Sequence, residues 1–405
     1  MTEKMPMDDD LTSLQADAVF NRPQREYRIC RRCIMDTSDP EITFDGQGIC
    51  RHCHAYDRVV SACVVRGAEG RAQLDAIAAR IKDEGKRKRY DCVIGLSGGV
   101  DSSYVAYLVK QLGLRPLAVH LDNGWNSETA VRNIENLVKK LGLDLYTHVL
   151  DWEEFRRLQV AFLRASTPDS EIPTDHAIVA ALYRTARRHR IGWLIEGANV
   201  VTESMIPRIW SHGHFDWRYI RSVNRAGGGG SLATYPHLTA FDFGVRFRMQ
   251  NLQRLQILHY VDYKKQDALD VLKRELGWVP YGKKHYESIY TRFYQGYVLP
   301  KKFGVDKRRA HLSSLICSHQ ISREEALREL ERPPYDPQQL AEDRTYVLKK
   351  LGFSIDEFER LMKMAPVPHD AYPSYRTRHY RYHESFFRII RPLTRQVRRL
   401  QKALK

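Results

Sequence analysis

The sequence contains a loop of small residues whose types and order suit the binding of phosphate groups. It lies between the apolar run 92–96 and the segment 105–112, in which apolar residues recur at helical spacing before Gly113. Glycines let the backbone approach a ligand closely, and the unpaired N–H groups at a helix start form an anion site. The residues that we expect to bind phosphate are Ser97, Gly98, Gly99, Val100, Asp101, Ser102 and Ser103.

Asp101 gives this loop a further property. A carboxylate at the helix start would repel phosphate unless a divalent cation joined the two, and Mg²⁺ bound to ATP does so. We therefore predict that Asp101 binds magnesium, and that Asp101 and Ser97 take part in catalysis with ATP. The Lys of a Walker-type loop is absent, so this is another class of phosphate site.

Four of the seven cysteines form two Cys-x-x-Cys pairs. Cys30 and Cys33 are separated from Cys50 and Cys53 by the segment 34–49, in which we expect a small hairpin. Two such pairs predict a structural zinc site with four thiolate ligands and no open position. A redox pair would need only one Cys-x-x-Cys, so we favour zinc.

Short apolar runs alternate with segments of helical periodicity between 90 and 204. Such alternation predicts an α/β fold in which helices cover both faces of a parallel sheet. We expect ligands to bind at the carboxyl ends of the strands. The predicted strands are 92–96, 116–121, 143–150 and 192–195, and the predicted helices are 105–112, one that begins at Ser127 and one that begins at Thr174.

Polar residues follow two of these strands. His120 and Asp122 lie at the end of the second strand, and Gly197 and Asn199 follow the fourth. Because the ends of parallel strands meet at one edge of a sheet, we assign these four residues to the nucleoside part of ATP. Asp and Asn also cap loops commonly, which is the alternative interpretation.

The segment 277–318 interleaves Lys and Arg with Gly, Phe and Tyr. Cations among aromatic residues suit packing against a bound anion, and they would stabilise a departing pyrophosphate. We expect Lys284 and Arg308 to act in catalysis. The residues that we expect to bind pyrophosphate or substrate are Lys283, Arg292, Lys302 and Lys307.

The pattern divides the chain into five predicted segments. They are a disordered leader (1–26), a zinc-binding module (27–65), a phosphate-loop domain (66–248), a mostly helical region (249–370) and a basic amphipathic tail (371–405). We predict a mobile loop near 210–235, because the four glycines at 227–230 favour many backbone conformations.

The composition of the 405 residues is that of an ordinary globular protein, with 43% hydrophobic and 28% charged residues. No apolar run could span a bilayer and the N-terminus lacks the core of a signal peptide, so we predict a cytoplasmic protein. The net charge is +16, but 376–405 alone holds eight Arg and two Lys against one Glu. We therefore expect no nucleic acid on the body, and the tail suits a membrane surface, a protein partner or a simple charged extension.

The loop at 97–103 resembles the SGGxDS signature of the PP-loop ATP pyrophosphatases, which have an adenine nucleotide alpha hydrolase-like fold. Together with the two cysteine pairs and the basic segment 277–318, it resembles the N-acetyl sugar amidotransferase family of bacterial lipopolysaccharide O-antigen biosynthesis. The resemblance covers roughly 27–365. It implies that ATP adenylylates the N-acetyl carbonyl of a nucleotide-activated diacetamido sugar, and that ammonia then replaces the oxygen to give an acetamidino sugar.

The resemblance also implies a partner, a class I glutaminase that supplies the ammonia. The chain fits this division, because Thr2 follows the initiator Met and no Gly-x-Cys-x-Gly motif is present. Two alternatives stay open. One is a tRNA-thiolating enzyme of the same fold, although 150–203 lacks the cysteine that such enzymes commonly use. The other is a zinc-knuckle nucleic-acid-binding protein that takes ATP only as a ligand.

Overall fold

The computed structural model of the chain describes residues 26–281 and 286–375, and a parallel sheet lies at its centre. The strands have the order β3-β2-β1-β4-β5, and every neighbouring pair is parallel. They are β1 (Cys92–Gly95), β2 (Pro116–Asp122), β3 (Asp144–Val149), β4 (Trp193–Glu196) and β5 (Gln253–Gln256). The predicted α/β fold with a parallel sheet is confirmed.

The fifth strand corrects the predicted domain boundary at 248. The sequence predicts only helices after this point, but β5 pairs with β4 and completes the sheet. Its residues are Gln, Arg, Leu and Gln, and only Leu255 is buried, so no apolar run reveals it. The phosphate-loop domain therefore continues through β5 to α10 (Lys265–Leu276), which packs on α3 (Val100–Gln111).

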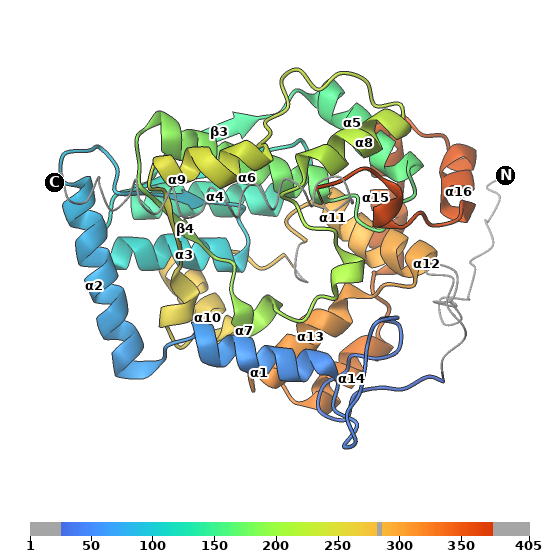
Figure 1. Cartoon of the computed structure of the whole chain (residues 1–405), viewed down its shortest axis with the longest axis horizontal. Coiled ribbons are helices and arrows are strands. Elements are labelled where there is room, and N and C mark those ends of the chain that lie inside the picture. The colour runs from blue at the N-terminus through green and yellow to red at the C-terminus, as the bar shows by residue number, and fades with distance from the viewer. Residues whose placement is uncertain (1–25, 282–285, 376–405) are drawn as a thin grey trace.

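Helices cover both faces of the sheet (Figure 1). Val93 and Leu194 face a core that includes α6 (Ile172–Arg188), whereas Ile94 and Ile195 face a second core that includes α3. This division follows from the alternation of side chains along each strand. The other helices around the sheet are α2 (Gly67–Gly85), α4 (Glu128–Leu141), α5 (Trp152–Arg164), α8 (Trp217–Ala226) and α9 (Phe247–Met249).

Capping residues fix the ends of the helices that follow β2 and β3. Ser127 caps α4 as predicted, and its hydroxyl oxygen accepts from Ala130 N at 3.2 Å. Gly142 ends this helix in the left-handed conformation. α6 begins at Ile172 instead of the predicted Thr174, because Pro173 already suits the first helical turn.

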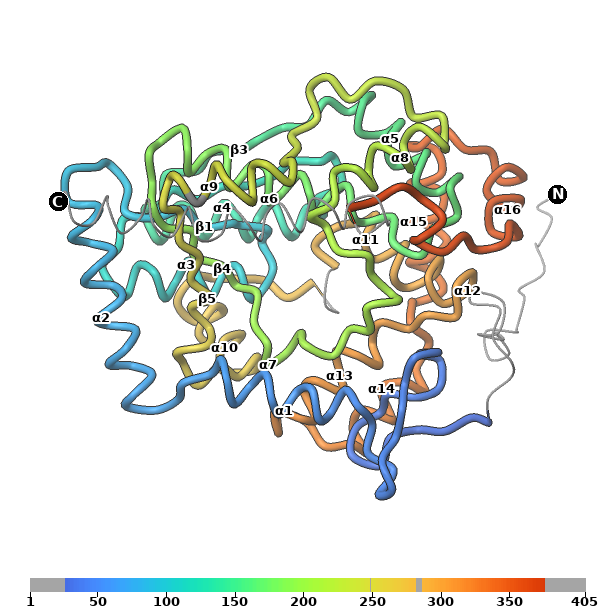
Figure 2. The backbone as a smooth tube through the Cα atoms, in the orientation of Figure 1, coloured from blue at the N-terminus to red at the C-terminus, as the bar shows by residue number. Residues whose placement is uncertain are grey.

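The N-terminal module packs against helices that are distant in sequence (Figure 2). An isolated antiparallel bridge between Phe44 and Cys50 stands where the sequence predicts a hairpin, and a second bridge joins Ile29 to Asp36. α1 (Arg51–Cys63) follows them, and it contacts both α7 (Val200–Glu203) and α13 (Lys307–Cys317). The remaining helices of this half are α11 (Ile289–Phe293), α12 (Leu299–Phe303), α14 (Arg323–Glu331), α15 (Pro337–Leu351) and α16 (Ile355–Lys363).

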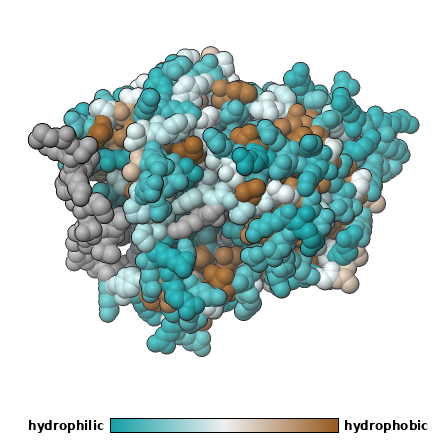
Figure 3. Space-filling view, turned by 180° about the vertical axis from the view of Figure 1, so that it is seen from behind, coloured by the Kyte–Doolittle hydropathy of each residue, from teal (hydrophilic) through white to brown (hydrophobic). Residues whose placement is uncertain are grey.

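None of the helices in 26–281 and 286–375 combines the length and the apolar character needed to cross a membrane. The face seen in Figure 3 is mostly hydrophilic, with hydrophobic patches between the polar side chains. The predicted leader and basic tail lie outside the described residues, except for Glu26 and 371–375.

The segment predicted as a mobile loop, 210–235, contains helix α8. The helix is capped by Asp216, whose carboxylate accepts from Tyr219 N at 2.9 Å. A Cβ at Gly227 would lie only 2.2 Å from the carbonyl oxygen of Ala161 on α5. The lack of a side chain therefore allows α5 to pack closely against the end of α8, a use of glycine that the sequence did not predict.

Gly227→Ala is expected to destabilise the protein, because the added methyl group has no space beside the α5 backbone. Overpacking of this kind costs about 1–3 kcal/mol, which corresponds to a melting temperature lower by roughly 1–4 °C for a chain of this length. Gly46→Ala is the matched control, since no atom lies within 4 Å of a Cβ at Gly46. Equal melting temperatures for the two variants in scanning calorimetry would contradict this packing.

Candidate functional site

The loop between β1 and α3 is held by its own side chains and by a tight approach to α4. The hydroxyl oxygens of Ser97 and Ser102 are 3.1 Å apart, and Ser97 Oγ accepts from Gly99 N at 3.2 Å. Gly98 has a φ of +80°, and a Cβ there would lie 2.7 Å from Ala130 O. The conformation of the loop therefore depends on glycine at position 98.

Asp101 lies in the first turn of α3, where the ends of β1 and β4 meet. A Cβ at Gly197 would lie 3.2 Å from the carbonyl group of Asp101. Tyr263 donates its hydroxyl proton to Asp101 Oδ1. Burial, followed by the charge of Asp101, raises the pKa of Tyr263 above its ordinary value of 10.0. The phenol therefore stays protonated at neutral pH and orients the carboxylate.

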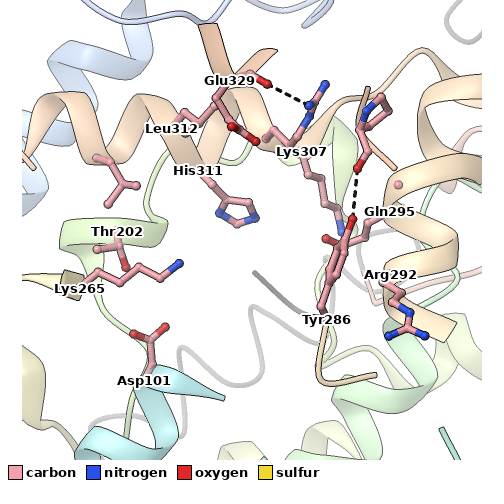
Figure 4. A pocket seen from close by; sticks show the side chains of 14 residues that line it. Asp101, Thr202, Lys265, Tyr286, Arg292, Gln295, Lys307, His311, Leu312 and Glu329 are labelled. Carbon is pink, nitrogen blue, oxygen red and sulfur yellow. Dashed lines mark hydrogen bonds between the residues drawn. The ribbon is translucent and has the colours of Figure 1, made fainter. Parts of the chain in front are cut away.

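Asp101 opens onto a cavity of about 260 Å³ between the sheet domain and the C-terminal helices (Figure 4). Thr202 and Lys265 lie on the same side as Asp101, Tyr286 lies opposite, and the ring of His311 points between the two sides. Further lining residues are Arg292, Gln295, Lys307, Arg308, Leu312 and Glu329. The fold thus brings the phosphate loop close to three of the predicted cations, Arg292, Lys307 and Arg308. At least 190 residues of sequence separate Asp101 from each of them.

Lys307 is held at the cavity wall by a fixed carboxylate. Its Nζ lies 3.2 Å from Glu171 Oε2, and both side chains are largely buried. Burial disfavours the charged ammonium, but the carboxylates of Glu171 and Asp169 outweigh it and raise the pKa of Lys307 above 10.5. Lys307 therefore stays charged at neutral pH, and an ammonium group has three donors with which to bind anions.

Arg308 and Arg292 reach the cavity wall but direct their guanidinium groups into the protein. Arg308 donates to both carboxylate oxygens of Asp306 and to the carbonyl oxygen of Glu329. Arg292 pairs with Asp343, and its guanidinium points away from the cavity in Figure 4. These contacts anchor both guanidinium groups, and the predicted roles of Arg308 in catalysis and of Arg292 in pyrophosphate binding stay predictions.

The ring of His120 is engaged within the protein. Its Nδ1 lies 2.8 Å from Leu96 O and its Nε2 lies 3.0 Å from Asn126 Nδ2, so the ring joins the ends of β1 and β2. Both nitrogens are therefore engaged within the protein, and a contact of the ring with ATP stays a prediction. Ser103 also differs from its prediction, because it is fully buried in α3 and its hydroxyl does not reach the loop surface.

Asp122 and Asn199 have the capping role that the sequence left as an alternative. Asp122 Oδ1 accepts from Gly124 N at 2.9 Å. Asn199 Oδ1 caps α7 by accepting from Thr202 N at 2.9 Å. Both residues thus shape the loops at the carboxyl edge of the sheet, and a contact of either one with the nucleoside stays a prediction.

Lys302 lies apart from the cavity. It donates to the carbonyl oxygen of Leu361 and lies beside a small apolar pocket with Phe303 and Phe358. Burial lowers the pKa of Lys302 from 10.5 to about 8. This position does not support the predicted contact with pyrophosphate. The predicted Lys283 and Lys284 lie outside the described residues.

Lys302→Met is expected to remove a pH dependence of stability. The pKa of Lys302 is about 8 in the folded protein against 10.5 ordinarily, so the unfolded chain binds more protons in that window. The free energy of unfolding of the wild type should therefore rise from pH 8 to pH 10.5 relative to the variant. Urea denaturation across this range measures the difference, and parallel pH profiles would contradict the buried position.

Lys265 and His311 are cavity residues to which the sequence analysis assigned no role. Lys265 begins α10, and its backbone N–H donates to Gln320 Oε1 at 2.8 Å. A lysine at a helix start is not a motif, and only β5 brings this one to the carboxyl edge of the sheet. Recognition of β5 in the sequence would have indicated that Lys265 lies at the cavity. The position of His311 depends instead on how α13 packs against the rest of the protein.

The two cysteine pairs converge on one point. Their four sulfur atoms lie within 4.8 Å of one another, and the Cys30–Cys53, Cys33–Cys50 and Cys50–Cys53 separations are 3.8, 3.7 and 3.7 Å. Tetrahedral zinc with Zn–S bonds of about 2.3 Å requires sulfur atoms about 3.8 Å apart. The N–H of Cys50 also points at Cys30 Sγ, at 3.2 Å. The donor set therefore fits a tetrathiolate zinc site.

The protein is expected to contain one zinc ion per chain, because four thiolates complete its coordination. Cys50→Ser should lose most of the metal, as measured by inductively coupled plasma mass spectrometry. Cys63→Ser is the control, since Cys63 is exposed and outside the cluster. Equal zinc contents in the two variants would show that the cluster is not the metal site.

Two separate parts of the chain match known protein families. Residues 287–386 match the family described as LPS (lipopolysaccharide) biosynthesis protein WbpG-like, C-terminal domain, and residues 72–165 match the NAD synthase family. The second match contains the phosphate loop and β1 to β3. The first contains α11 to α16 and thus the wall of the cavity that faces Asp101.

Individual relatives cover smaller parts of the chain. It is 30% identical over 146 residues to the tRNA(Ile)-lysidine synthase of Chlamydia pneumoniae, which is 35% of this chain and 41% of that protein. It is 31% identical over 98 residues to a tRNA-specific 2-thiouridylase of Pediococcus pentosaceus, which is 21% of this chain and 26% of that protein. The matched part is thus less than half of either relative.

A solved structure, NMN synthetase from Francisella tularensis, has 16% identity and a TM-score of 0.32, and the match covers 75% of this chain and 99% of that chain. The family matches agree with the parallel sheet, the phosphate loop and the helical second half. The chain is thus similar to the NAD synthase family around its phosphate loop, and to the C-terminal domain of WbpG-like lipopolysaccharide-biosynthesis proteins in its helical second half.

Proposed function

We propose that the protein is an ATP-dependent amidotransferase that forms AMP and pyrophosphate and converts an N-acetyl group of a nucleotide-activated diacetamido sugar into an acetamidino group. The shared cavity is the observation that carries this proposal. Asp101 of the PP-loop faces Lys307 and His311, which belong to the residues that match the WbpG-like domain. An ATP-activating loop and a polysaccharide-biosynthesis domain therefore meet at one site.

The chemistry requires activation because an amide carbon is a poor electrophile and its oxygen a poor leaving group. In the proposed first step, the N-acetyl oxygen attacks the α-phosphorus of ATP and pyrophosphate leaves. Ammonia then adds to the activated carbon, a proton is lost, and AMP departs with the original oxygen. The contributions expected of the protein are the positioning of the reactants and the stabilisation of developing charge.

The cavity supplies groups for the first step. The N–H groups at the start of α3 suit the phosphates of ATP. Asp101, oriented by Tyr263, is suited to bind Mg²⁺, which would neutralise phosphate charge. Lys265 and Lys307 approach from different walls and are suited to hold the departing pyrophosphate. We prefer these assignments to the predicted roles of Arg292 and Arg308, whose guanidinium groups are paired within the protein.

The opposite wall has a composition that suits a sugar. Tyr286, Leu312 and Pro334 offer apolar surface, while Gln295 and Glu329 add polar groups. Such a mixture matches a sugar ring, which has an apolar face and hydroxyl groups at its edge. His311 points into the space between the two walls, where a base could accept the proton that ammonia loses.

We also assign the supply of ammonia to a separate class I glutaminase. The sequence contains no Gly-x-Cys-x-Gly motif that could provide the cysteine nucleophile of such an enzyme. In this proposal the protein works in the cytoplasm with Mg²⁺-ATP and a structural zinc ion, and its acetamidino sugar is a precursor of lipopolysaccharide O-antigen. Free ammonium should replace the partner in vitro.

The proposed reaction predicts sugar-dependent ATP–pyrophosphate exchange. Asp101→Asn should reduce this exchange by at least about 100-fold, because the phosphate loop loses its magnesium ligand, while Lys302→Met should keep it. Product mass with ammonium present should show an acetamidino group in place of an acetamido group. Absence of exchange with every UDP- or CMP-linked diacetamido sugar tested would overturn the proposal.

A tRNA-modifying activity is the second candidate, and the two tRNA enzymes among the relatives favour it in part. The matches to these two enzymes cover 35% and 21% of this chain, whereas residues 287–386 match the WbpG-like domain. Exchange that depends on tRNA and not on a diacetamido sugar would favour this candidate. Binding of tRNA should then fall steeply with salt.

A further inference from the structure

Helix α13 has two functional faces, and only one of them lies in the cavity. Arg308, His311, Leu312 and Leu315 line the cavity. Arg309, Ser313 and Cys317 recur every four residues and lie on another face. Because both sets of residues belong to one rigid α-helix, a displacement of one face also displaces the other.

The second face of α13 contacts the four-cysteine module directly. Arg309 pairs with Asp36 at 2.8 Å and donates to Ile34 O at 3.1 Å. Ser313 Oγ accepts from Ile34 N at 3.2 Å. Cys317 Sγ lies 3.8 Å from Cys53 Sγ, next to the predicted metal centre. These contacts span the whole length of the helix.

The same module also holds the other side of the cavity. Tyr56 of α1 donates its hydroxyl proton to Val201 O at 3.1 Å. Val201 precedes Thr202, which lines the cavity beside Asp101. The module is therefore hydrogen-bonded to α7 and to α13, both of which line the cavity.

The part of the module that precedes α1 has little structure of its own apart from the cysteine cluster. Within 28–50 the described backbone forms two isolated bridges and no helix or sheet. Small modules of this kind draw their stability from the metal, so metal binding and ordering are one event. Loss of zinc would therefore release Ile34 and Asp36, the partners of Ser313 and Arg309.

We infer that Arg309, Ser313 and Cys317 couple the zinc site to the cavity, so that zinc occupancy sets the affinity of the cavity for pyrophosphate. The ligand in this inference rests on the proposed function, whereas the coupling rests on the contacts of α13. Coupling between two sites is reciprocal, so pyrophosphate must strengthen zinc binding by the same factor. Arg309 is a positioning residue, since it does not line the cavity.

The test measures both directions of this coupling with the full chain. Calorimetric titration of magnesium pyrophosphate should give a dissociation constant at least about fivefold lower for the zinc-loaded than for the zinc-free protein. Competition with a zinc chelator should show the same factor in zinc affinity when magnesium pyrophosphate is present. Lys307→Met, which loses a cavity cation, controls for direct chelation of zinc by pyrophosphate and should abolish this effect.

Variants keep the test informative if the zinc-free protein unfolds. Arg309→Met, loaded with zinc, should bind pyrophosphate at least about fivefold more weakly while it retains its metal. Arg309→Lys should recover part of the loss by keeping the charge opposite Asp36. Arg32→Gln is the matched control, because Arg32 lies in the same module but pairs with Asp57 of α1.

The outcomes separate the two proposals. Unchanged pyrophosphate affinity in zinc-loaded Arg309→Met would overturn the coupling, and so would equal weakening by Arg32→Gln. Absence of pyrophosphate binding to the zinc-loaded wild type would instead overturn the proposed function of the cavity. Weakening confined to the Arg309 variants, with zinc content unchanged, supports the coupling.

Discussion

The close approach of the chain around Asp101 determines where this carboxylate lies in the fold. Gly98 fits against α4 only without a Cβ, and Gly197 approaches the Asp101 carbonyl to a distance that leaves little space for one. A parallel sheet directs the ends of β1 and β4 to the same edge, so these contacts set the carboxylate at the open end of the sheet. Tyr263 then fixes its orientation.

The phosphate loop alone does not enclose a site, and the second half of the chain supplies the opposite wall. α13 is central to this wall, because its sequence alternates between cavity residues and residues that contact the cysteine module. The module in turn reaches α7 on the Asp101 side. The four-cysteine module therefore contacts both sides of the cavity.

The sequence was sufficient for the parts of the structure that depend on local patterns. Apolar runs revealed β1 to β4, the loop revealed Asp101, and spacing alone revealed the four cysteines. β5 was missed because an edge strand needs few apolar residues, and Lys265 was missed with it. The partners of Arg308 and Lys302, the Asp306 carboxylate and the Leu361 carbonyl, could not be predicted because they are set by tertiary packing, which no motif reports.

Positive charge in the sequence is thus a poor guide to positive charge in the cavity. The chain carries a net charge of +16, yet the two arginines at the cavity wall are paired with carboxylates. Lys307 is also paired with a carboxylate, but its ammonium group keeps N–H donors for a further partner. A guanidinium group that is hydrogen-bonded along both edges does not keep them. Because Glu171 holds this lysine in place before an anion arrives, little reorganisation is needed when charge develops on a leaving group. The ion pairs within the protein therefore determine which cations are available to bind an anion in the cavity. The buried carboxylates thus contribute to the site as directly as the lysines do.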